Sequence, residues 1–235
     1  MRHSPRILMI ATSASTMGSS DEPTGIWLEE LTTPYYAFQD GGAHVLLASI
    51  AGGPVPIDPR SVKPAGENDA SVERYLADDD FRAKVSQTPA FDALDPNDFD
   101  AVFLPGGHGT MFDYPQNAAL AGIVETMDRA GKFIAAVCHG PAGLVGARKA
   151  DGTPFVADRR VAAFTDSEER AVGLDKAVPF LLESRLRELG ARHESAPDFQ
   201  PFAIRDGNLV TGQNPASAGI TADLLMTTLK EGKTA

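Results

Sequence analysis

The only cysteine of the chain, Cys138, stands where a catalytic nucleophile would be presented. It follows the apolar run Lys132–Val137 and precedes His139 and Gly140-Pro141. Pro141 suits the first position of a helix, where a missing N–H costs nothing. The pattern predicts a tight strand-to-helix turn at the carboxyl edge of a sheet, where open α/β sheets bind ligands. We also expect the helix N-terminus to lower the pKa of the thiol and stabilise a thiolate.

The alternative for a lone cysteine is a small buried hydrophobic residue. His139 favours a nucleophile instead, because an adjacent imidazole can exchange a proton with the thiol and stabilise the ion pair. The other histidines, His108 among them, show no spacing typical of metal ligands. With a single cysteine in the chain, we therefore expect no zinc site and no cofactor.

A glycine-rich turn, Leu104–Gly109, follows another predicted strand. Gly106 and Gly107 would let backbone N–H groups approach a reacting oxygen closely, and two such donors form an oxyanion hole. Phe112 stands at the position of the third glycine of a GxGxxG pattern, which argues against a dinucleotide site. A plain tight turn is the alternative for this segment.

A third candidate is Glu30, which belongs to a predicted amphipathic helix. It lies four residues from Ile26 and Pro34 and three from Trp27, and therefore within the apolar stripe of that helix. A carboxyl buried there should have a raised pKa and be poised as an acid or a base. The alternative is a solvated glutamate at the rim of the helix.

An acidic cluster, Thr165–Glu169, follows one more predicted strand. An acid at a strand end can orient His139 and hold its tautomer. Spacing alone leaves Asp166, Glu168 and Glu169 as candidates for this role. A cluster that only caps a helix is the alternative.

These candidates are positioned by apolar runs that alternate with amphipathic stretches. The predicted strands are Arg6–Ala11, Ala43–Ser49, Asp100–Leu104, Lys132–Val137, Arg160–Phe164 and Asn208–Thr211. The predicted helices are Ile26–Asp40, Ala118–Ala130, Ala142–Ala147, Val178–Leu189 and Ala216–Leu229. This alternation implies right-handed βαβ units, and hence an α/β fold with a mostly parallel central sheet and helices on both faces.

Residues 51–98 interrupt the alternation. They are rich in Gly, Pro and Asp, contain one predicted helix near Val72–Ser86, and have too few apolar residues to fold alone. We interpret the segment as a small insertion after the second strand, packed on a single domain of residues 1–235.

Composition excludes several classes of protein. The net charge of −11 repels phosphate backbones, so we expect no nucleic-acid partner. No apolar stretch approaches the roughly 20 residues that cross a bilayer, so we expect no membrane association. The run Ile7–Ala11 is too short for a signal-peptide core, and one cysteine excludes a disulfide framework. A cytoplasmic location is expected.

Taken together, the motifs resemble those of the ThiJ/PfpI superfamily. Within it, the chain is similar to the branch of heat-inducible chaperones and glutathione-independent glyoxalases (glyoxalase III). The matching segments run in order over almost the whole chain: Thr24-Gly25 with Glu30, Leu104–Gly109, Val137–Pro141, Phe164–Glu169 and Leu209–Ser217. The insertion after Gly52-Gly53 also resembles this branch rather than the shorter, deglycase-like proteins.

The resemblance implies a flavodoxin-like three-layer sandwich of the class I glutamine-amidotransferase type, assembled as a homodimer. It implies conversion of methylglyoxal and related α-oxoaldehydes to hydroxy acids such as lactate, through a cysteine hemithioacetal and without glutathione. Some members carry a metal on a cap domain, but the insertion contains no histidine. The implied site consists of the nucleophile Cys138, its neighbour His139, the buried acid Glu30, the triad acid Glu169, and the oxyanion-hole residues Gly106 and Gly107.

Three other functions remain open on the same residues. A holdase chaperone would bind unfolded proteins independently of Cys138. Another cysteine-dependent lyase or hydrolase would use the same site on a different substrate. A redox sensor would oxidise Cys138 beside Glu30.

Overall fold

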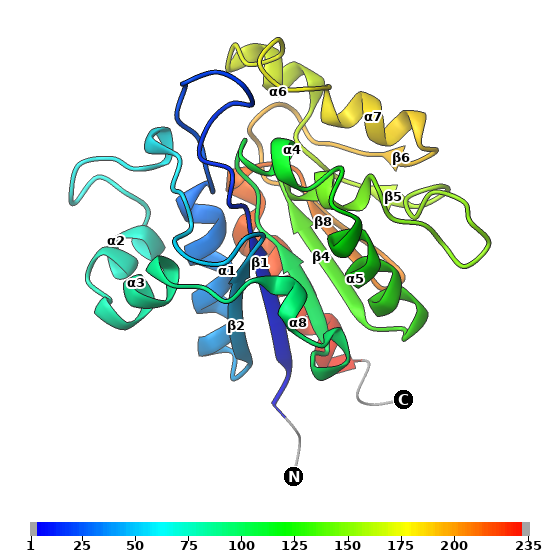
Figure 1. Ribbon diagram of the computed structural model, residues 1–235, viewed down its shortest axis with the longest axis horizontal. Coiled ribbons are helices and arrows are strands. Elements are labelled where there is room, and N and C mark those ends of the chain that lie inside the picture. The colour runs from blue at the N-terminus through cyan, green and yellow to red at the C-terminus, as the bar shows by residue number, and fades with distance from the viewer. Residues whose placement is uncertain (1–3, 232–235) are drawn as a thin grey trace.

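The computed structural model describes residues 4–231 and shows three layers, with a parallel sheet between two layers of helices (Figure 1). The sheet has six strands in the order β2-β1-β3-β4-β8-β7, and only the edge strand β7 is antiparallel. Its strands are β1 (Arg6–Ala11), β2 (His44–Ser49), β3 (Ala101–Leu104), β4 (Phe133–Val137), β7 (Ala203–Asp206) and β8 (Leu209–Gly212). A separate two-stranded sheet pairs β5 (Arg160–Val161) with β6 (Arg192–His193).

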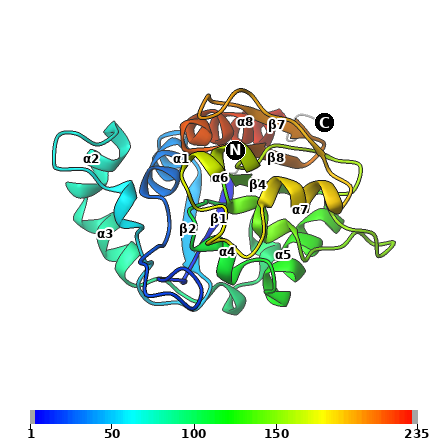
Figure 2. The same cartoon turned by 90° about the horizontal axis from the view of Figure 1, so that it is seen from above.

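Helices cover both faces of the large sheet, as the view from above shows (Figure 2). On one face lie α1 (Leu28–Asp40) and α8 (Ala218–Glu231), which pack against each other. On the other face lies α5 (Ala118–Arg129), and α7 (Leu182–Glu188) shares its core. The predicted fold class, a flavodoxin-like α/β sandwich, is confirmed.

Two apolar cores result from the side-chain alternation of the strands. In β1, Leu8 and Ile10 enter the core under α5, whereas Ile7 and Met9 enter the core under α1 and α8. Both faces of β1 are buried, which explains why its sequence is a continuous apolar run.

Residues 51–98 pack beside α1. They contain two helices, α2 (Ala70–Leu76) and α3 (Asp79–Ser86). The prediction of a single helix in this segment was therefore wrong. The chain turns at Asp78, whose side chain accepts a hydrogen bond from the Phe81 N–H and caps α3. The Phe81 ring stacks on Tyr35 of α1, with ring centroids 3.6 Å apart.

Two further predicted elements differ from the structure, and one strand was not predicted. The helix predicted at Ala142–Ala147 is a 3-10 turn over Gly140–Leu144, where Gly140 passes so close to β3 that a Cβ would lie 2.1 Å from the Leu104 carbonyl oxygen. The strand predicted at Arg160–Phe164 is reduced to β5 and pairs outside the large sheet. The antiparallel strand β7 was not predicted.

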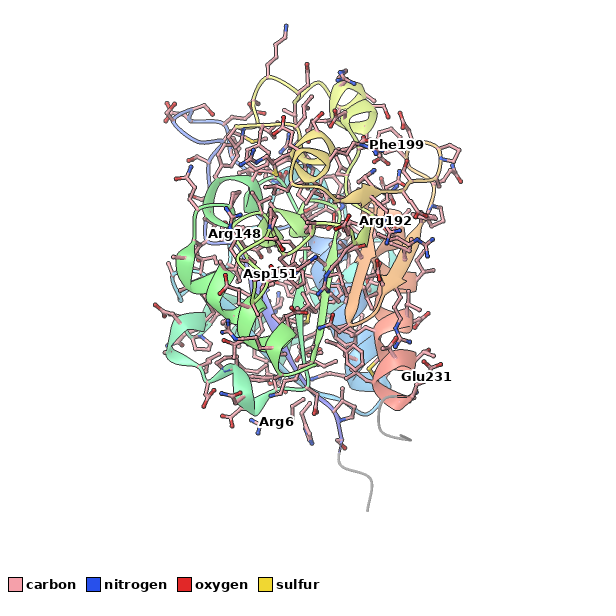
Figure 3. All side chains as sticks on the ribbon, turned by 90° about the vertical axis from the view of Figure 1, so that its right-hand side faces the viewer. Arg6, Arg148, Asp151, Arg192, Phe199 and Glu231 are labelled. Atoms are coloured by element: carbon pink, nitrogen blue, oxygen red, sulfur yellow. The ribbon has the colours of Figure 1, made fainter. Side chains whose placement is uncertain are left out.

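Short helical elements complete the chain. They are α4 (Thr110–Asp113), α6 (Asp166–Ala171), and 3-10 turns at Pro59–Ser61, Phe91–Ala93, Pro96–Asp98 and Pro215–Ser217. Arg6, which opens β1, and Phe199 lie at opposite ends of the molecule (Figure 3). Phe199 is therefore near the carboxyl ends of the parallel strands. Within residues 4–231, no helix is long and apolar enough to span a bilayer.

Candidate active site

Cys138 follows β4 directly and adopts a left-handed backbone conformation, with φ of 59°. Its N–H donates to the Gly212 carbonyl at 2.9 Å, and its carbonyl accepts from the Phe164 N–H at 2.9 Å. Such a conformation costs on the order of 1–3 kcal/mol in a residue other than glycine and persists only when surrounding structure fixes it. The two hydrogen bonds supply that constraint and hold the thiol at the carboxyl edge of the sheet.

A chain of hydrogen bonds begins at the thiol. Cys138 Sγ lies 3.2 Å from His139 Nδ1, and His139 Nε2 lies 2.7 Å from Glu169 Oε2. All three side chains are buried. The hydrogen bonds to two histidines hold the pKa of Glu169 well below its usual value despite burial, so this carboxyl is ionised.

The first turn of α6 decides which acid reaches His139. Thr165 caps this helix in a capping box with Glu168. Glu168 is bound besides by Gln213 and Asn214. Asp166 points to Ser184 on α7. Of the three acids that spacing left open, Glu169 therefore contacts His139.

Glu30 reaches the same site from α1. Its side chain is fully buried, and its Oε2 accepts a hydrogen bond from the Gly106 N–H at 3.0 Å. Burial raises its pKa well above the usual value, and the neighbouring Cys138 thiol opposes this shift. Glu30 Oε1 has no partner in hydrogen-bond geometry within the described residues. Burial therefore favours the protonated form of this carboxyl, and one of its oxygens is free of hydrogen bonds to the described residues.

The expectation that the thiol pKa would be lowered is wrong in direction. Burial raises it, and the carboxyls of Glu30, Glu168 and Glu169 raise it further. The predicted helix after Cys138 is only a five-residue 3-10 turn, which is too short to act as a strong dipole. A thiolate here requires a protonated Glu30 and a proton acceptor at His139.

His108 is a member of the cluster that sequence reasoning did not assign. Its Nε2 lies 2.8 Å from Glu169 Oε1, and its ring centroid lies 4.2 Å from that of His139. Burial, followed by the nearby His139, lowers its pKa to about 4. The sequence feature that could have identified His108 as a site residue is its position directly after Gly106-Gly107, at the end of a strand.

His108, His139 and Glu169 offer potential metal-ligand atoms within 4.8 Å of one another. The contacts of 2.7 and 2.8 Å between each Nε2 and the carboxylate have the length of charge-assisted hydrogen bonds. A zinc ion would instead have to lie about 2.0–2.2 Å from every ligand and displace these hydrogens. The arrangement is that of a hydrogen-bonded network.

Because Gly106 and Gly107 have no side chains, the turn after β3 can pack closely against the segment that contains Trp27 and Glu30. A Cβ on Gly106 would lie 2.5 Å from Glu30 Oε2, and one on Gly107 would lie 2.4 Å from the Trp27 nitrogen. The Gly106 N–H is committed to Glu30. The N–H groups of Gly107 and His139 have no acceptor among the residues that the structure describes.

A cavity of about 140 Å³ opens over Cys138. Glu30, Gly107, His108 and His139 contribute to its wall. The rest is apolar, from Trp27, Phe164, Val172, Phe199 and Pro215. Phe199 and Val172 are 45 % and 44 % exposed, so they mark its mouth.

A parallel sheet with a strained cysteine at its carboxyl edge, followed by a histidine, defines an α/β protein with a nucleophile turn. Residues 24–226 match the DJ-1/PfpI family. The chain belongs to this family, as its resemblance to ThiJ/PfpI proteins predicted.

Three relatives are similar over nearly the whole chain. Glutathione-independent glyoxalase HSP31 of Saccharomyces cerevisiae is 30% identical, with 92% of this chain and 94% of the relative covered. The structure of glyoxalase III from Candida albicans matches with a TM-score of 0.86 and 30% identity, covering 95% and 96% of the two chains. Rapid Encystment Protein 24 KDa of Francisella tularensis matches with a TM-score of 0.91 and 37% identity, covering 96% and 99%.

Proposed function

We propose that this protein is a glutathione-independent glyoxalase that converts methylglyoxal and related small α-oxoaldehydes to hydroxy acids. The observation that carries the proposal is the juxtaposition at one small cavity of Cys138, its hydrogen-bonded His139 and the protonated Glu30. The relatives named as glyoxalases support the same activity.

The size of the cavity favours a small substrate. An apolar cavity of about 150 Å³ in another protein holds a benzene-sized guest, and the cavity here measures about 140 Å³. Methylglyoxal is slightly smaller than benzene and presents a methyl group beside its two carbonyls. The apolar wall suits the methyl group, while the polar groups around Cys138 suit the carbonyl oxygens.

The first step is addition of the thiol to the aldehyde. The Cys138 proton passes to His139 Nδ1 while Sγ bonds to the aldehyde carbon. The carbonyl electron pair moves to its oxygen, which is stabilised by the Gly107 and His139 N–H groups. The oxygen then takes the proton of Glu30, giving a hemithioacetal, an ionised Glu30 and a protonated His139.

The second step moves hydrogen between the two carbons. The Glu30 carboxylate removes the C1 hydrogen, and the C2 oxygen takes the proton of His139, forming an enediol. A base in the cavity wall takes the C1 hydroxyl proton while the Glu30 proton goes to C2, and the product is a lactoyl thioester. Water then attacks the thioester, and the carbon–sulfur bond breaks to release lactate and regenerate the thiol.

The test is conversion of methylglyoxal to lactate without glutathione or added metal, by wild type and Cys138→Ala. We expect turnover by wild type and a loss of about 10⁴-fold or more in the variant, as for other catalytic nucleophiles. Melting curves should show that the variant remains folded.

Activity near wild type in Cys138→Ala would contradict the proposal. An inactive wild type whose cysteine still reacts with other electrophiles would instead favour a different lyase or hydrolase reaction at the same site.

A homodimer and a holdase role follow from the resemblance and are proposed on that basis. A cytoplasmic location is proposed from the composition, which includes a single cysteine. Light scattering of the purified protein would measure whether it is a homodimer. The holdase role predicts that Cys138→Ala still suppresses aggregation of a denatured client protein.

A further inference from the structure

Glu169 fixes the tautomers of two histidines at once. It is ionised and can only accept hydrogen bonds, and each of its oxygens contacts one Nε2, that of His108 at 2.8 Å and that of His139 at 2.7 Å. Both Nε2 atoms must therefore carry hydrogen. In each ring, the second nitrogen, Nδ1, is left to face another partner.

The two Nδ1 atoms have different surroundings. His139 Nδ1 contacts the Cys138 thiol. His108 Nδ1 is buried and has no hydrogen-bond partner among residues 4–231. With its ring neutral and its hydrogen on Nε2, His108 offers a lone pair at Nδ1. A buried polar atom without a partner costs about 1–3 kcal/mol. A ligand that donates a hydrogen bond to this nitrogen would remove that cost.

The cavity is where that ligand would lie. His108 is 5 % exposed and shares the cavity wall with Cys138 and Glu30. An acceptor nitrogen in this wall suits a hydroxyl group of whatever is bonded to the thiol. It does not suit an unmodified carbonyl oxygen, which has no hydrogen to donate.

We propose that His108 is a second catalytic base, whose Nδ1 accepts the C1 hydroxyl proton of the cysteine-bound intermediate. This inference rests on the proposed glyoxalase function and assigns the acceptor of the C1 hydroxyl proton, in a step in which Glu30 donates to C2 and His139 Nδ1 lies at the Cys138 sulfur. The transfer occurs as the enediol becomes the thioester.

The electrons and protons of this step balance. The C1 oxygen–hydrogen bond breaks, its proton goes to His108 Nδ1, and its electron pair forms the C1 carbonyl. The carbon–carbon π pair takes the proton of Glu30 at C2. After hydrolysis of the thioester, the protonated His108 returns its proton to the Glu30 carboxylate through the product carboxyl group, and both residues regain their starting states.

The deciding variant is His108→Gln, whose amide can still donate to Glu169 but offers no base. We expect kcat for methylglyoxal to fall by about 100-fold or more, while KM changes little. The rate of Cys138 alkylation by iodoacetamide should stay near wild type, because the Cys138–His139–Glu169 chain is retained. His44→Gln, at an exposed histidine that opens β2, is the matched control and should leave both rates unchanged.

Two outcomes overturn the inference. One is a His108→Gln enzyme with kcat near wild type. The other is a parallel loss of turnover and alkylation, which would make His108 a support for Glu169 alone. Inactive wild-type enzyme contradicts the proposed function itself, so the two failures are distinguishable.

A second measurement does not depend on a variant that folds. Nitrogen-15 NMR of the wild type should show an unprotonated His108 Nδ1, and its chemical shift should move when hydroxyacetone is added. This analogue has a hydroxyl but no aldehyde. A His108 Nδ1 that carries hydrogen, or a shift unaffected by saturating hydroxyacetone, would also overturn the inference.

Discussion

Glu30 Oε2 and the Gly106 N–H, 76 residues apart in the chain, are joined by a hydrogen bond of 3.0 Å. The bond ties α1 to the turn that follows β3, and it fixes the buried carboxyl beside Cys138. It also takes one glycine amide out of the predicted oxyanion hole. The cavity amides without an acceptor among residues 4–231 are those of Gly107 and His139.

The first prediction concerns the proton that Glu30 carries. Glu30→Gln keeps an oxygen for the Gly106 N–H but cannot transfer a proton, so we expect methylglyoxal turnover to fall by about 10²–10⁴-fold. The protonated carboxyl and the glutamine amide are both uncharged, so a loss of turnover without a large change in the rate of Cys138 alkylation by iodoacetamide would assign the effect to proton transfer.

The neighbouring Glu29 provides the control. It is half-buried and does not line the cavity over Cys138. Glu29→Gln should keep turnover close to that of wild type. A Glu30→Gln enzyme as active as Glu29→Gln would show that Glu30 has no part in proton transfer.

The second prediction concerns close packing at Gly106. Gly106→Ala would place a Cβ 2.5 Å from Glu30 Oε2 and 2.6 Å from the Val137 carbonyl oxygen. Overpacking of this kind costs about 1–3 kcal/mol. Urea unfolding should show this loss of stability, and turnover should fall because Glu30 is displaced.

Gly122, within α5, is the matched control because a Cβ there would meet none of the described atoms within 4 Å beyond the neighbouring backbone of its own helix. Gly122→Ala should stabilise the protein by up to about 1 kcal/mol, since alanine is the better helix former. If the two alanine variants had the same stability, the steric argument for Gly106 would be refuted.

Strands buried on both faces were the most predictable part of the fold. The runs that form β1 and β4 are apolar throughout, and such runs are typical of covered parallel sheets. The edge strand β7, Ala203–Asp206, was missed because it is short and half-polar. The turn at Gly207-Asn208 was its signal, since a two-residue loop of this kind joins hairpin strands.

The site was less predictable than the sheet, because contacts between distant segments decide it. The turn after β4 placed Cys138 and His139 together from local sequence alone. The choice of Glu169 over Asp166 depends on how α6 is capped and where α7 packs. The role of His108 depends on a carboxylate 61 residues away, which spacing in the sequence cannot reveal.

The last prediction concerns pH and His108. An unfolded histidine has its ordinary pKa of 6.5, whereas burial lowers that of folded His108 to about 4. Between these values the unfolded chain binds the proton and the folded protein does not. The free energy of unfolding should therefore decrease as pH falls from 6.5 to 4, by about 3 kcal/mol at most from this residue.

Urea unfolding of wild type and His108→Gln between pH 7.5 and 4.5 measures this contribution of His108 to stability. We expect the variant to lose less stability over this range, and His44→Gln to behave as wild type does. Equal slopes for wild type and His108→Gln would mean that folded His108 binds its proton over the same pH range as the unfolded chain, which would contradict a pKa lowered by burial.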